Sequence, residues 1–501
     1  MSCAPFRTGS RNGHRMPADR RTDRWMLPGA LLLSVAIRAT LLVKPRSYQA
    51  DEVFQYLEQA HRLVFGPGVI PWEYRLGIRS WLFPLALSGP MALGGWLAPG
   101  TGAYLLLPKI ALVLLSLTVV RAAYSLGRRI SPLHALVAAL VAAGWSELAL
   151  FATQALSDSV ALPLFFGGAA LLYGKPGPRR LAAAGSLLAL ACLIRFQDTP
   201  AILLFVVLVC RLDRQRWLWG LAGAVPMLAI SAAIDLAMGQ APFGWVWANF
   251  HQNITVGRSY LWVEKPSFYL RRIVTIWKVA ALPILILAGI GARRYPALLA
   301  MAAADIALHS AVAHKEYRYI LLATTAIALL AAIGTADAVT WARQRWSRAP
   351  WLTVALLFWG ITSIMTTRPR FVAYEWSQAT PSLEAFTLAR NSPEICGLAV
   401  HGIWWSHTGA YAYLHRPIPQ YLPDFAHDPG AALRTGAPAF DAIVAPPRTR
   451  DLPSSYGVKQ CFGEDGRYPD QAACLYERSG VCDPRPAAPF EINRALIATD
   501  R

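Results

Sequence analysis

Long apolar runs separated by short polar segments account for most of the chain. Each run is close to the length that an α-helix needs to cross a bilayer, although the two between residues 181 and 210 are short enough to cross only in part. The pattern predicts an all-α polytopic membrane protein with about eleven transmembrane helices. The runs lie near residues 25–43, 104–126, 132–151, 159–173, 181–194, 199–210, 217–238, 273–291, 296–313, 319–334 and 351–367.

Basic clusters between the runs predict which helix ends lie in the cytoplasm, because short loops rich in Lys and Arg stay inside. An N-terminus inside places every cluster on the cytoplasmic side only if residues 80–98 do not cross. Pro84, Pro90 and a Gly pair interrupt that segment, which is typical of a re-entrant or interfacial stretch. The clusters are Arg128/Arg129, Lys175/Arg179/Arg180, Arg211/Arg214/Arg216, Arg293/Arg294 and Arg343/Arg345/Arg348.

Composition supports a membrane protein and accounts for the positive charge. Hydrophobic residues make up 55% of the chain and charged residues 15%, with a mean hydropathy of +0.35, too apolar for an ordinary soluble enzyme. The net charge of +19 follows the predicted membrane topology and therefore does not indicate a nucleic-acid partner. Residues 1–24 hold several Arg, no apolar run and no signal-peptide cleavage site, which predicts a disordered cytoplasmic tail.

The chain changes character after the last apolar run. Residues 368–501 are less apolar and rich in Pro, and the segments GLAVHGIWW and DAIVAP predict β-strands between turn residues. An odd number of crossings from an N-terminus inside puts this region outside. It is therefore expected to form a small α/β cap domain above a membrane domain at residues 25–367, whose first outer loop is 45–103.

Four cysteines fall in the cap domain, and disulfides persist in an outer compartment. One or two disulfides are expected, and the sequence leaves all three pairings open. The spacing does not resemble a zinc site. The four are Cys396, Cys461, Cys474 and Cys482.

The predicted topology gathers the polar, motif-like segments on the outer face, as a single outer active site requires. A transporter would instead place ionisable residues near the middle of the bilayer and show two related halves, which the sequence does not. The segments are QADE (49–52), WEYRLGIRS (72–80), LSDS (156–159), IRFQD (194–198), the 240–272 loop and HKEYRY (314–319).

Carboxylates and guanidinium groups in these segments suit group transfer from a phosphate. Asp51 or Glu52 can deprotonate an acceptor hydroxyl, although both also suit the first turn of an interfacial helix, where Val53 and Phe54 begin an apolar face. Cations are needed where charge develops on a leaving phosphate. Arg195, Arg271, Arg272, Lys315 and Arg318 are available. A solvated loop end is the simpler explanation for Arg271 and Arg272, and an anchor to head groups is an equal alternative for Arg195.

Three acids in or near the membrane, Glu147, Asp235 and Asp305, are expected to pair with Arg or Lys on other helices.

In this order, the segments resemble glycosyltransferase family 22, the dolichol-pathway and GPI-anchor mannosyltransferases of the GT-C superfold. The stretch DEVFQYLEQAHRLVFGPGVIPWEYRLGIRSWLFP is similar to the family's first-loop signature, HKEYRY to its HKE-x-RF box, and IRFQDTP to its IRPT segment. The stretch HGIWWSHTGAYAYLHRPIPQYL resembles an outer segment of the third mannosyltransferase of GPI synthesis. The likeness spans residues 25 to 425. In the first loop it covers Asp51, Glu52, Phe54, Gln55, Glu58, Ala60, His61, Phe65, Gly66, Gly68, Trp72, Glu73, Arg79 and Ser80.

The resemblance implies the chemistry and the site. Asp51 would be the general base and Glu52 would support it. The reaction would be inverting transfer of mannose from a polyprenyl-phosphate-mannose donor to a hydroxyl of a glycan or glycolipid acceptor, with no metal or other cofactor. The expected location is a bacterial inner membrane with a periplasmic active site, or the endoplasmic reticulum membrane in a eukaryote. The implied substrate-binding residues are Gln55, His61, Trp72, Glu73, Arg79, Asp158, Arg195, Gln197, His314, Lys315, Glu316 and Arg318.

Two departures from the family pattern bear on the substrates. Ala50 stands where the family has Pro, and VEKPSFYL at 263–270 stands where the family has a loop with His and paired Trp. That loop borders the substrates in the family, so the identity of the acceptor is left open. A GT-C transferase that uses an arabinosyl, galactosyl or glucosyl lipid donor remains an alternative, as does a polytopic lipid or sugar transporter.

Overall fold

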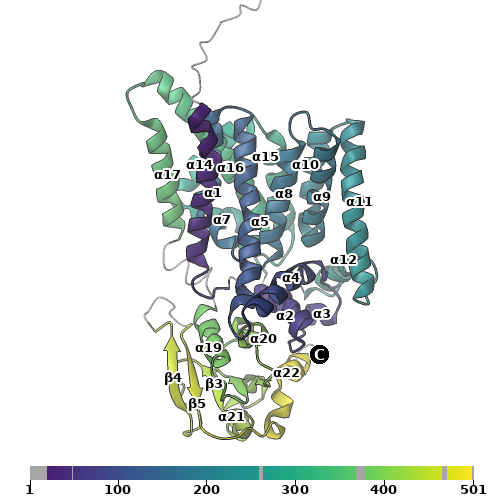
Figure 1. Cartoon of the computed structure of the whole chain (residues 1–501), viewed down its shortest axis with the longest axis vertical. Coiled ribbons are helices and arrows are strands. Elements are labelled where there is room, and N and C mark those ends of the chain that lie inside the picture. Colours follow the sequence, from purple (N-terminus) through teal and green to yellow (C-terminus); the bar gives the residue numbers. More distant parts are fainter. Residues whose placement is uncertain (1–19, 48, 259–262, 368–378, 465–470, 499–501) are drawn as a thin grey trace, which may run out of the picture.

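The computed structural model describes residues 20–47, 49–258, 263–367, 379–464 and 471–498, and shows a helical bundle above a smaller C-terminal domain (Figure 1). The predicted tail at 1–24 lies mostly outside the described residues, and the first helix already begins at Arg20. The bundle contains α1 (Arg20–Leu41), α5 (Ala103–Arg128), α6 (Pro132–Gly144), α7 (Ser146–Phe151), α8 (Ser157–Leu172), α9 (Pro178–Ile194), α10 (Thr199–Cys210), α11 (Arg214–Ala237), α13 (Phe268–Trp277), α14 (Ala281–Ala292), α15 (Pro296–Ala311), α16 (Leu321–Arg345) and α17 (Trp351–Thr366).

Within the described residues, five helical segments are long and apolar enough to cross a membrane, and a bent pair makes a sixth when it is counted as one span. The pair is α9 and α10, which meet at an angle of 117°. The chain is therefore a multi-pass membrane protein. The predicted total of about eleven crossings requires shorter apolar helices to cross as well, and it stays a prediction.

The two ends of the bundle differ in charge. Arg129 donates to the carbonyl of Ala170, Arg216 donates to the carbonyls of Leu172 and Gly174, and Arg294 pairs with Asp337. These contacts join at one end the loops that carry the predicted cytoplasmic clusters. The C-terminal domain lies at the other end (Figure 1).

The first loop lies between the bundle and the C-terminal domain. It forms the π-helix η1 (Glu52–Leu57), α2 (Glu58–Phe65), α3 (Trp72–Arg75) and α4 (Leu82–Leu97). The helix α4, which carries the segment predicted not to cross, lies at this end of the bundle beside α2 and α3 (Figure 1). The short helix α12 (Gly244–Phe250) lies there too.

The first-loop helices are buried on their polar side as well. Gln55, Glu58 and Gln59 are at most 2% exposed, and Glu58 accepts hydrogen bonds from the amides of Val69 and Ala412, both at 2.6 Å. The interpretation of this stretch as a simple interfacial helix is wrong. Its polar face meets the C-terminal domain, and backbone N–H groups satisfy its carboxylate.

The C-terminal domain is built on a five-stranded mixed sheet, as the α/β prediction requires. The strand order is β2-β1-β3-β5-β4, with β1 parallel to β2 and β3, and β5 antiparallel to β3 and β4. Both strands predicted from sequence are confirmed. The elements are α19 (Thr380–Arg390), β1 (Leu398–Val400), α20 (Ala410–Leu414), β2 (Gln420–Tyr421), α21 (Pro429–Gly436), β3 (Ala442–Ala445), β4 (Gly457–Phe462), β5 (Ala473–Glu477) and α22 (Ile492–Ala498).

Two disulfides staple this domain and resolve the pairing that the sequence left open. Cys396 pairs with Cys482, and Cys461 pairs with Cys474 across the strands β4 and β5. The first bridge joins positions 86 residues apart and closes most of the domain into one loop. Closing a loop of this length restricts the unfolded chain strongly.

Three acids that were expected to pair with Arg or Lys have other partners among the described residues, so that expectation is wrong. Glu147 accepts hydrogen bonds from two indole N–H groups and a tyrosine hydroxyl. Asp235 accepts from a backbone amide and an indole, and Asp305 accepts from a backbone amide and faces a histidine. Neutral donors can satisfy a buried carboxylate when enough of them converge. The partners are Trp145, Trp277 and Tyr317 for Glu147, Phe243 and Trp245 for Asp235, and Ala323 and His309 for Asp305.

Candidate active site

A polar pocket of about 330 Å³ opens at the end of the bundle that faces the C-terminal domain. It draws residues from all six segments that the sequence predicted to meet. Its lining is Asp51, Tyr56, Arg79, Ser157, Arg195, Phe196, Gln197, Asn249, Phe250, Asn253, Ile254, Leu308, His309, Val312, His314, Arg318 and Tyr319.

Arg318 is the central cation of this pocket. Its guanidinium lies 2.5 Å from Asp51, 2.8 Å from Glu316 and 3.5 Å from Asp158. The side chain is 3% exposed. It lies in the short 3₁₀ turn η6 (Tyr317–Ile320), which leads into α16 and brings the HKEYRY segment to the pocket. Three carboxylates around one buried guanidinium fix its position without filling all five of its N–H donors.

Arg195 occupies the turn between α9 and α10. It pairs with Asp158 at 3.0 Å and with Asp198 at 3.1 Å, and it lies 5.0 Å from the centre of the Tyr319 ring. The side chain is 5% exposed. Arg195 therefore points into the protein and does not anchor to lipid head groups. Asp158 also pairs with Arg318, so this one carboxylate connects the two guanidinium groups.

Asp51 is held from two sides. One carboxylate oxygen accepts from Arg318 and the other from the Gln55 amide at 2.8 Å, while the same amide donates to Glu73 at 2.7 Å. Burial, with help from the Asp51 carboxylate, raises the pKa of Glu73 to about 7. Gln55 and Glu73 thus lie behind Asp51 and orient it, while Asp51 itself faces the pocket.

Glu316 ties the HKEYRY segment together. It accepts from Arg318, from His314 at 3.0 Å, from the Tyr319 hydroxyl at 3.0 Å and from Gln49 at 2.8 Å. Burial favours the neutral acid, but the Arg318 charge and these donors prevail and hold the pKa of Glu316 well below its usual range. Glu316 therefore remains a carboxylate and positions Arg318.

Several residues predicted for the site lie outside the pocket lining. Glu52 is fully buried, pairs with Lys109 at 3.0 Å and accepts from the amide of Ala155. Lys315 donates to backbone carbonyls of Glu264, Val312 and Ala313. Trp72 stacks with Arg258, and His61 meets His415 of the C-terminal domain at 3.0 Å. Arg271 is 60% exposed and lies 3.9 Å from Glu264, in keeping with a solvated loop end.

Other residues of the pocket lining were not predicted from the sequence. Tyr56, Asn249 and His309 lie in apolar or amphipathic runs where nothing marks them individually. Tyr319 ends the quoted HKEYRY segment, and its ring lies against both guanidinium groups, 5.2 Å from Arg318. The spacing of Asp305 and His309, one helical turn apart, was the available signal for His309.

In the part of the chain that the structure describes, two groups of side chains could hold a metal ion. Asp198, Asp305 and His309 are buried with their ligand atoms within 4.8 Å of one another, next to the pocket. Arg195 pairs with Asp198 at 3.1 Å, and a ring nitrogen of His309 lies 3.4 Å from the same carboxylate, so Asp198 already has partners. The second group, Cys396 with Asp441 and Cys482, loses its thiolates to the disulfide.

The fold is shared with solved structures. ArnT from Cupriavidus metallidurans, in the structure bound to undecaprenyl phosphate, matches with a TM-score of 0.58 at 13% identity, over 93% of this chain and 100% of that one. The Archaeoglobus fulgidus oligosaccharyltransferase matches with a TM-score of 0.50 at 14% identity, over 84% of this chain and 68% of that one. The architecture is therefore the GT-C fold that the sequence predicted.

The chain belongs to the Alg9-like mannosyltransferase family, whose sequence model matches residues 30–392. GPI mannosyltransferase 3 of Yarrowia lipolytica is 29% identical over 312 residues, which are 58% of this chain and 59% of the relative. GPI mannosyltransferase 3 of Drosophila melanogaster is 46% identical over 59 residues, 12% of this chain and 10% of the relative. In each case the match spans less than two thirds of the relative's length.

Proposed function

We propose that this protein is a membrane mannosyltransferase that transfers mannose, with inversion, from a polyprenyl-phosphate-mannose donor to a hydroxyl of a glycan or glycolipid. The observation that carries the proposal is the arrangement of Asp51 with Arg318 and Arg195 in one pocket, in a chain of this family. One carboxylate and two guanidinium groups match what the reaction needs at its two ends. The carboxylate receives a proton, and the guanidinium groups receive a phosphate.

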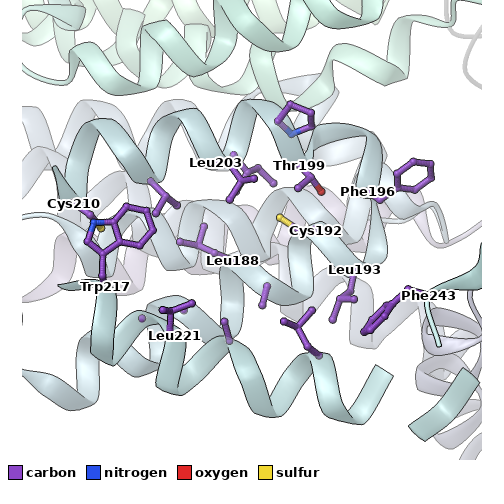
Figure 2. A pocket seen from close by; sticks show the side chains of 18 of the residues that line it. Leu188, Cys192, Leu193, Phe196, Thr199, Leu203, Cys210, Trp217, Leu221 and Phe243 are labelled. Carbon is purple, nitrogen blue, oxygen red and sulfur yellow. The ribbon is translucent and has the colours of Figure 1, made fainter. Parts of the chain in front are cut away.

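An apolar groove beside the pocket supports a lipid-linked donor. A cavity of about 720 Å³ lies between α9, α10 and α11, and it shares Phe196 with the polar pocket. Figure 2 shows Cys210 and Trp217 at one end of this groove and Phe196 and Phe243 at the other. Leu203 and Leu221 on its walls are 52% and 54% exposed, so the groove is open sideways. A polyprenyl chain fits such a groove, with its phosphate at the Phe196 end.

The reaction then follows from the positions of these groups. The acceptor hydroxyl oxygen bonds to the anomeric carbon as the bond from that carbon to the phosphate oxygen breaks. The hydroxyl proton passes to Asp51, and the electron pair leaves on the polyprenyl phosphate. Arg318 and Arg195 stabilise the growing phosphate charge, because their donors are fixed before the reaction starts.

Binding of the donor also prepares the base. In the pocket one oxygen of Asp51 is engaged by Arg318. A donor phosphate competes for the same guanidinium, and Arg can clasp phosphate through two N–H groups. When the phosphate takes the place of Asp51 as the acceptor of this N–H group, that oxygen of Asp51 is free to accept a proton. We propose no metal in this reaction, because guanidinium groups supply the charge; loss of activity in a chelator would instead point to Asp198, Asp305 and His309.

The outer face is the side we propose for the active site. Basic loops gather at the opposite end of the bundle, in accord with the positive-inside rule. Two disulfides in the C-terminal domain suit an oxidising compartment. Both features support a periplasmic site in a bacterium or a luminal site in a eukaryote.

The direct test incubates purified protein with labelled polyprenyl-phosphate mannose and a cell lipid extract, followed by the mass of the product. Transfer of one hexose to a lipid-extractable acceptor is expected. If the protein transferred sugar from an arabinosyl, galactosyl or glucosyl lipid but not from this donor, the donor sugar would not be mannose.

A groove variant tests the lipid part of the donor. Leu188→Trp would fill the middle of the groove, so the half-saturating concentration of a long-chain donor should rise about tenfold or more, the cost of losing a well-packed apolar contact. A donor with a short, water-soluble chain should be used as well by the variant as by the original protein. Leu357→Trp, at an exposed position on α17 away from the groove, controls for the larger side chain elsewhere in the bundle. Equal loss with both donors would place the polyprenyl chain elsewhere.

A further inference from the structure

A third cavity, of about 560 Å³, lies in the C-terminal domain and shares no lining residue with the polar pocket. It opens where β1 ends, between the segment after that strand and the short turn Pro423–Phe425. Two tryptophans, one phenylalanine and one aspartate dominate its walls. The lining is Val400, Gly402, Ile403, Trp404, Trp405, Leu422, Asp424 and Phe425.

Exposed aromatic surface is the main feature of this cavity. Trp404 is 66% exposed, although Trp is usually well covered in a folded domain. Phe425 and Trp405, by contrast, pack partly into the core. An indole face left open beside a cavity offers a flat apolar platform with an N–H at its edge. A pyranose ring has a matching face of C–H groups and a rim of hydroxyls.

A polar network borders the platform. His401 lies between Asp424 and Asp451, whose side chains are 32% and 43% exposed. Asp424 also accepts from the amide of Gly402 at 2.7 Å, which fixes the carboxylate at the mouth of the cavity. Burial alone would lower the pKa of His401, but the two carboxylates raise it. Each carboxylate oxygen has two lone pairs, so both acids can accept further hydrogen bonds from sugar hydroxyls.

The cavity is connected to the candidate base through one aromatic contact. The ring of Trp405 meets that of Phe54 edge-on, with centroids 4.9 Å apart. Phe54 lies in η1, three residues after Asp51. The contact thus places the aromatic platform against the helical segment whose N-terminal cap is Asp51.

We propose that this cavity binds a sugar ring of the glycan acceptor and directs its reactive hydroxyl towards Asp51. The assignment rests on the proposed function, since it names where that reaction holds its second substrate. The carboxylates at the rim favour neutral hydroxyls over the anionic head groups of a membrane, because like charges repel at short range. A role of Trp404 as a bilayer anchor is therefore the alternative that the experiment must separate.

The kinetic test uses full-length Trp404→Ala, labelled polyprenyl-phosphate mannose and the lipid extract that supports transfer. The half-saturating amount of extract should rise about tenfold or more, the size usual for loss of a tryptophan anchor. The half-saturating donor concentration and the rate at saturation should stay within about twofold. Trp404→Phe should recover much of the loss, and Trp346→Ala, an exposed tryptophan at the basic end of the bundle, is the matched control. An equal change for donor and acceptor would assign Trp404 to the bilayer or the fold and overturn the proposal.

A binding test separates failure of this inference from failure of the proposed function. A photoreactive mannoside is cross-linked to the purified protein, and the labelled peptide is mapped by mass spectrometry. Label is expected within residues 402–425, competed by methyl mannoside and absent in Trp404→Ala. Asp51→Asn should label normally, since it lacks only the base. Label elsewhere, or none in the original protein, would reject the site even if transfer is observed; label in the cavity without transfer would reject only the proposed reaction.

Discussion

At the scale of single residues, Arg318 is the one on which the arrangement of the pocket depends most. Three carboxylates share it, so removal of its charge would take this guanidinium away from Asp51 and Glu316 and leave Asp158 to Arg195 alone. Uncompensated buried charge is among the most destabilising changes a protein can undergo. The sequence identified this arginine through the HKEYRY segment, because that motif places it beside a histidine and a glutamate at a helix mouth.

Asp51 is the residue whose loss should affect chemistry most and folding least. Asp51→Asn keeps the shape and the hydrogen bond from Gln55, but it removes the proton acceptor. Turnover should fall about 10²–10⁴-fold, the usual cost of losing a general base. Initial rates at saturating donor, with equal amounts of folded protein, measure this.

The matched control for Asp51 is Asp213→Asn, the same change at a half-exposed side chain among the basic loops. It should leave the rate unchanged. Near-normal turnover in Asp51→Asn would remove Asp51 from the reaction, and the next carboxylate to test would be Asp158.

Other parts of the site could not be read from the residues alone. The sequence placed Asp51 and Glu52 side by side, but not the different directions in which they point. Glu52 reaches Lys109, 57 positions away by number, and only the packing of η1 against α5 brings the two together. The link from Gln55 to both Asp51 and Glu73 likewise depends on how α3 folds back on η1.

At the scale of elements, η1 and the residue before it direct their side chains to different parts of the molecule. Successive residues of a helix point about a quarter-turn or more apart, so neighbouring carboxylates separate at once. Asp51 faces the pocket, Glu52 faces α5, and Phe54 faces the C-terminal domain. A shift in this one element would therefore disturb the base, the bundle and the domain contact together.

The pair of Glu52 and Lys109 should matter for stability more than for catalysis. Glu52→Gln leaves a buried cation without its partner, which typically costs about 3–5 kcal/mol. The double variant Glu52→Gln with Lys109→Met should be less destabilised than the sum of the single variants. Thermal unfolding in detergent measures both.

Glu384→Gln provides the comparison, since it breaks an ion pair with Lys44 whose lysine is half exposed. Its effect should stay below about 1 kcal/mol. If Glu52→Gln proved fully stable yet inactive, Glu52 would take part in the reaction, and the assignment of the base would need revision.

The helix α2 carries a contact that should respond to acid. Burial, followed by the neighbouring His415, lowers the pKa of His61 to about 4. The unfolded chain, with its ordinary histidine pKa of about 6.5, therefore binds a proton more readily than the folded one between these values. Stability from this site is complete above pH 6.5 and is lost as the pH falls towards 4, by about 2 kcal/mol at pH 5.

The midpoint of thermal unfolding between pH 7 and pH 5 checks this dependence. The decrease should be smaller in His61→Gln, which keeps polar contacts and does not titrate in this range. His427→Gln, which changes an exposed histidine of the C-terminal domain, should behave like the original protein. An identical decrease in all three would show that other groups govern the acid response.

At the scale of the whole molecule, the sequence predicted the membrane bundle, the α/β domain and the end of the bundle where the motifs meet. Hydropathy and basic clusters carry that information along the chain itself. The docking of the two parts was not predictable, because it relies on pairs such as Glu58 with Ala412 that are separated by 354 positions. Such long-range contacts leave no periodic pattern in the sequence.

The orientation of the molecule can be tested by labelling single cysteines in a chain whose Cys3, Cys192 and Cys210 are replaced by Ser. The loop before α5 lies close to the C-terminal domain, since Gly102 faces Arg390 of α19. Thr101→Cys should therefore react with an impermeant reagent from the outside, and Arg348→Cys, between α16 and α17, should react only from the cytoplasm.

Labelling of Thr101→Cys only from the cytoplasmic side would reverse the topology and move the active site to the other face. Labelling of both positions from one side would instead mean that an odd number of the short helices between them fails to cross.

The contacts between the first loop and the C-terminal domain also constrain how relatives can exchange parts. Glu58 and His61 meet Ala412 and His415 through side-chain contacts that replace water on both surfaces. A chimaera that takes its C-terminal domain from another family member, and is joined only after α17, would pair a native loop with a foreign surface. Grafts that carry residues 49–76 together with the domain keep both halves of that surface from one parent. In terms of inheritance, these two distant stretches of the chain behave as a single module.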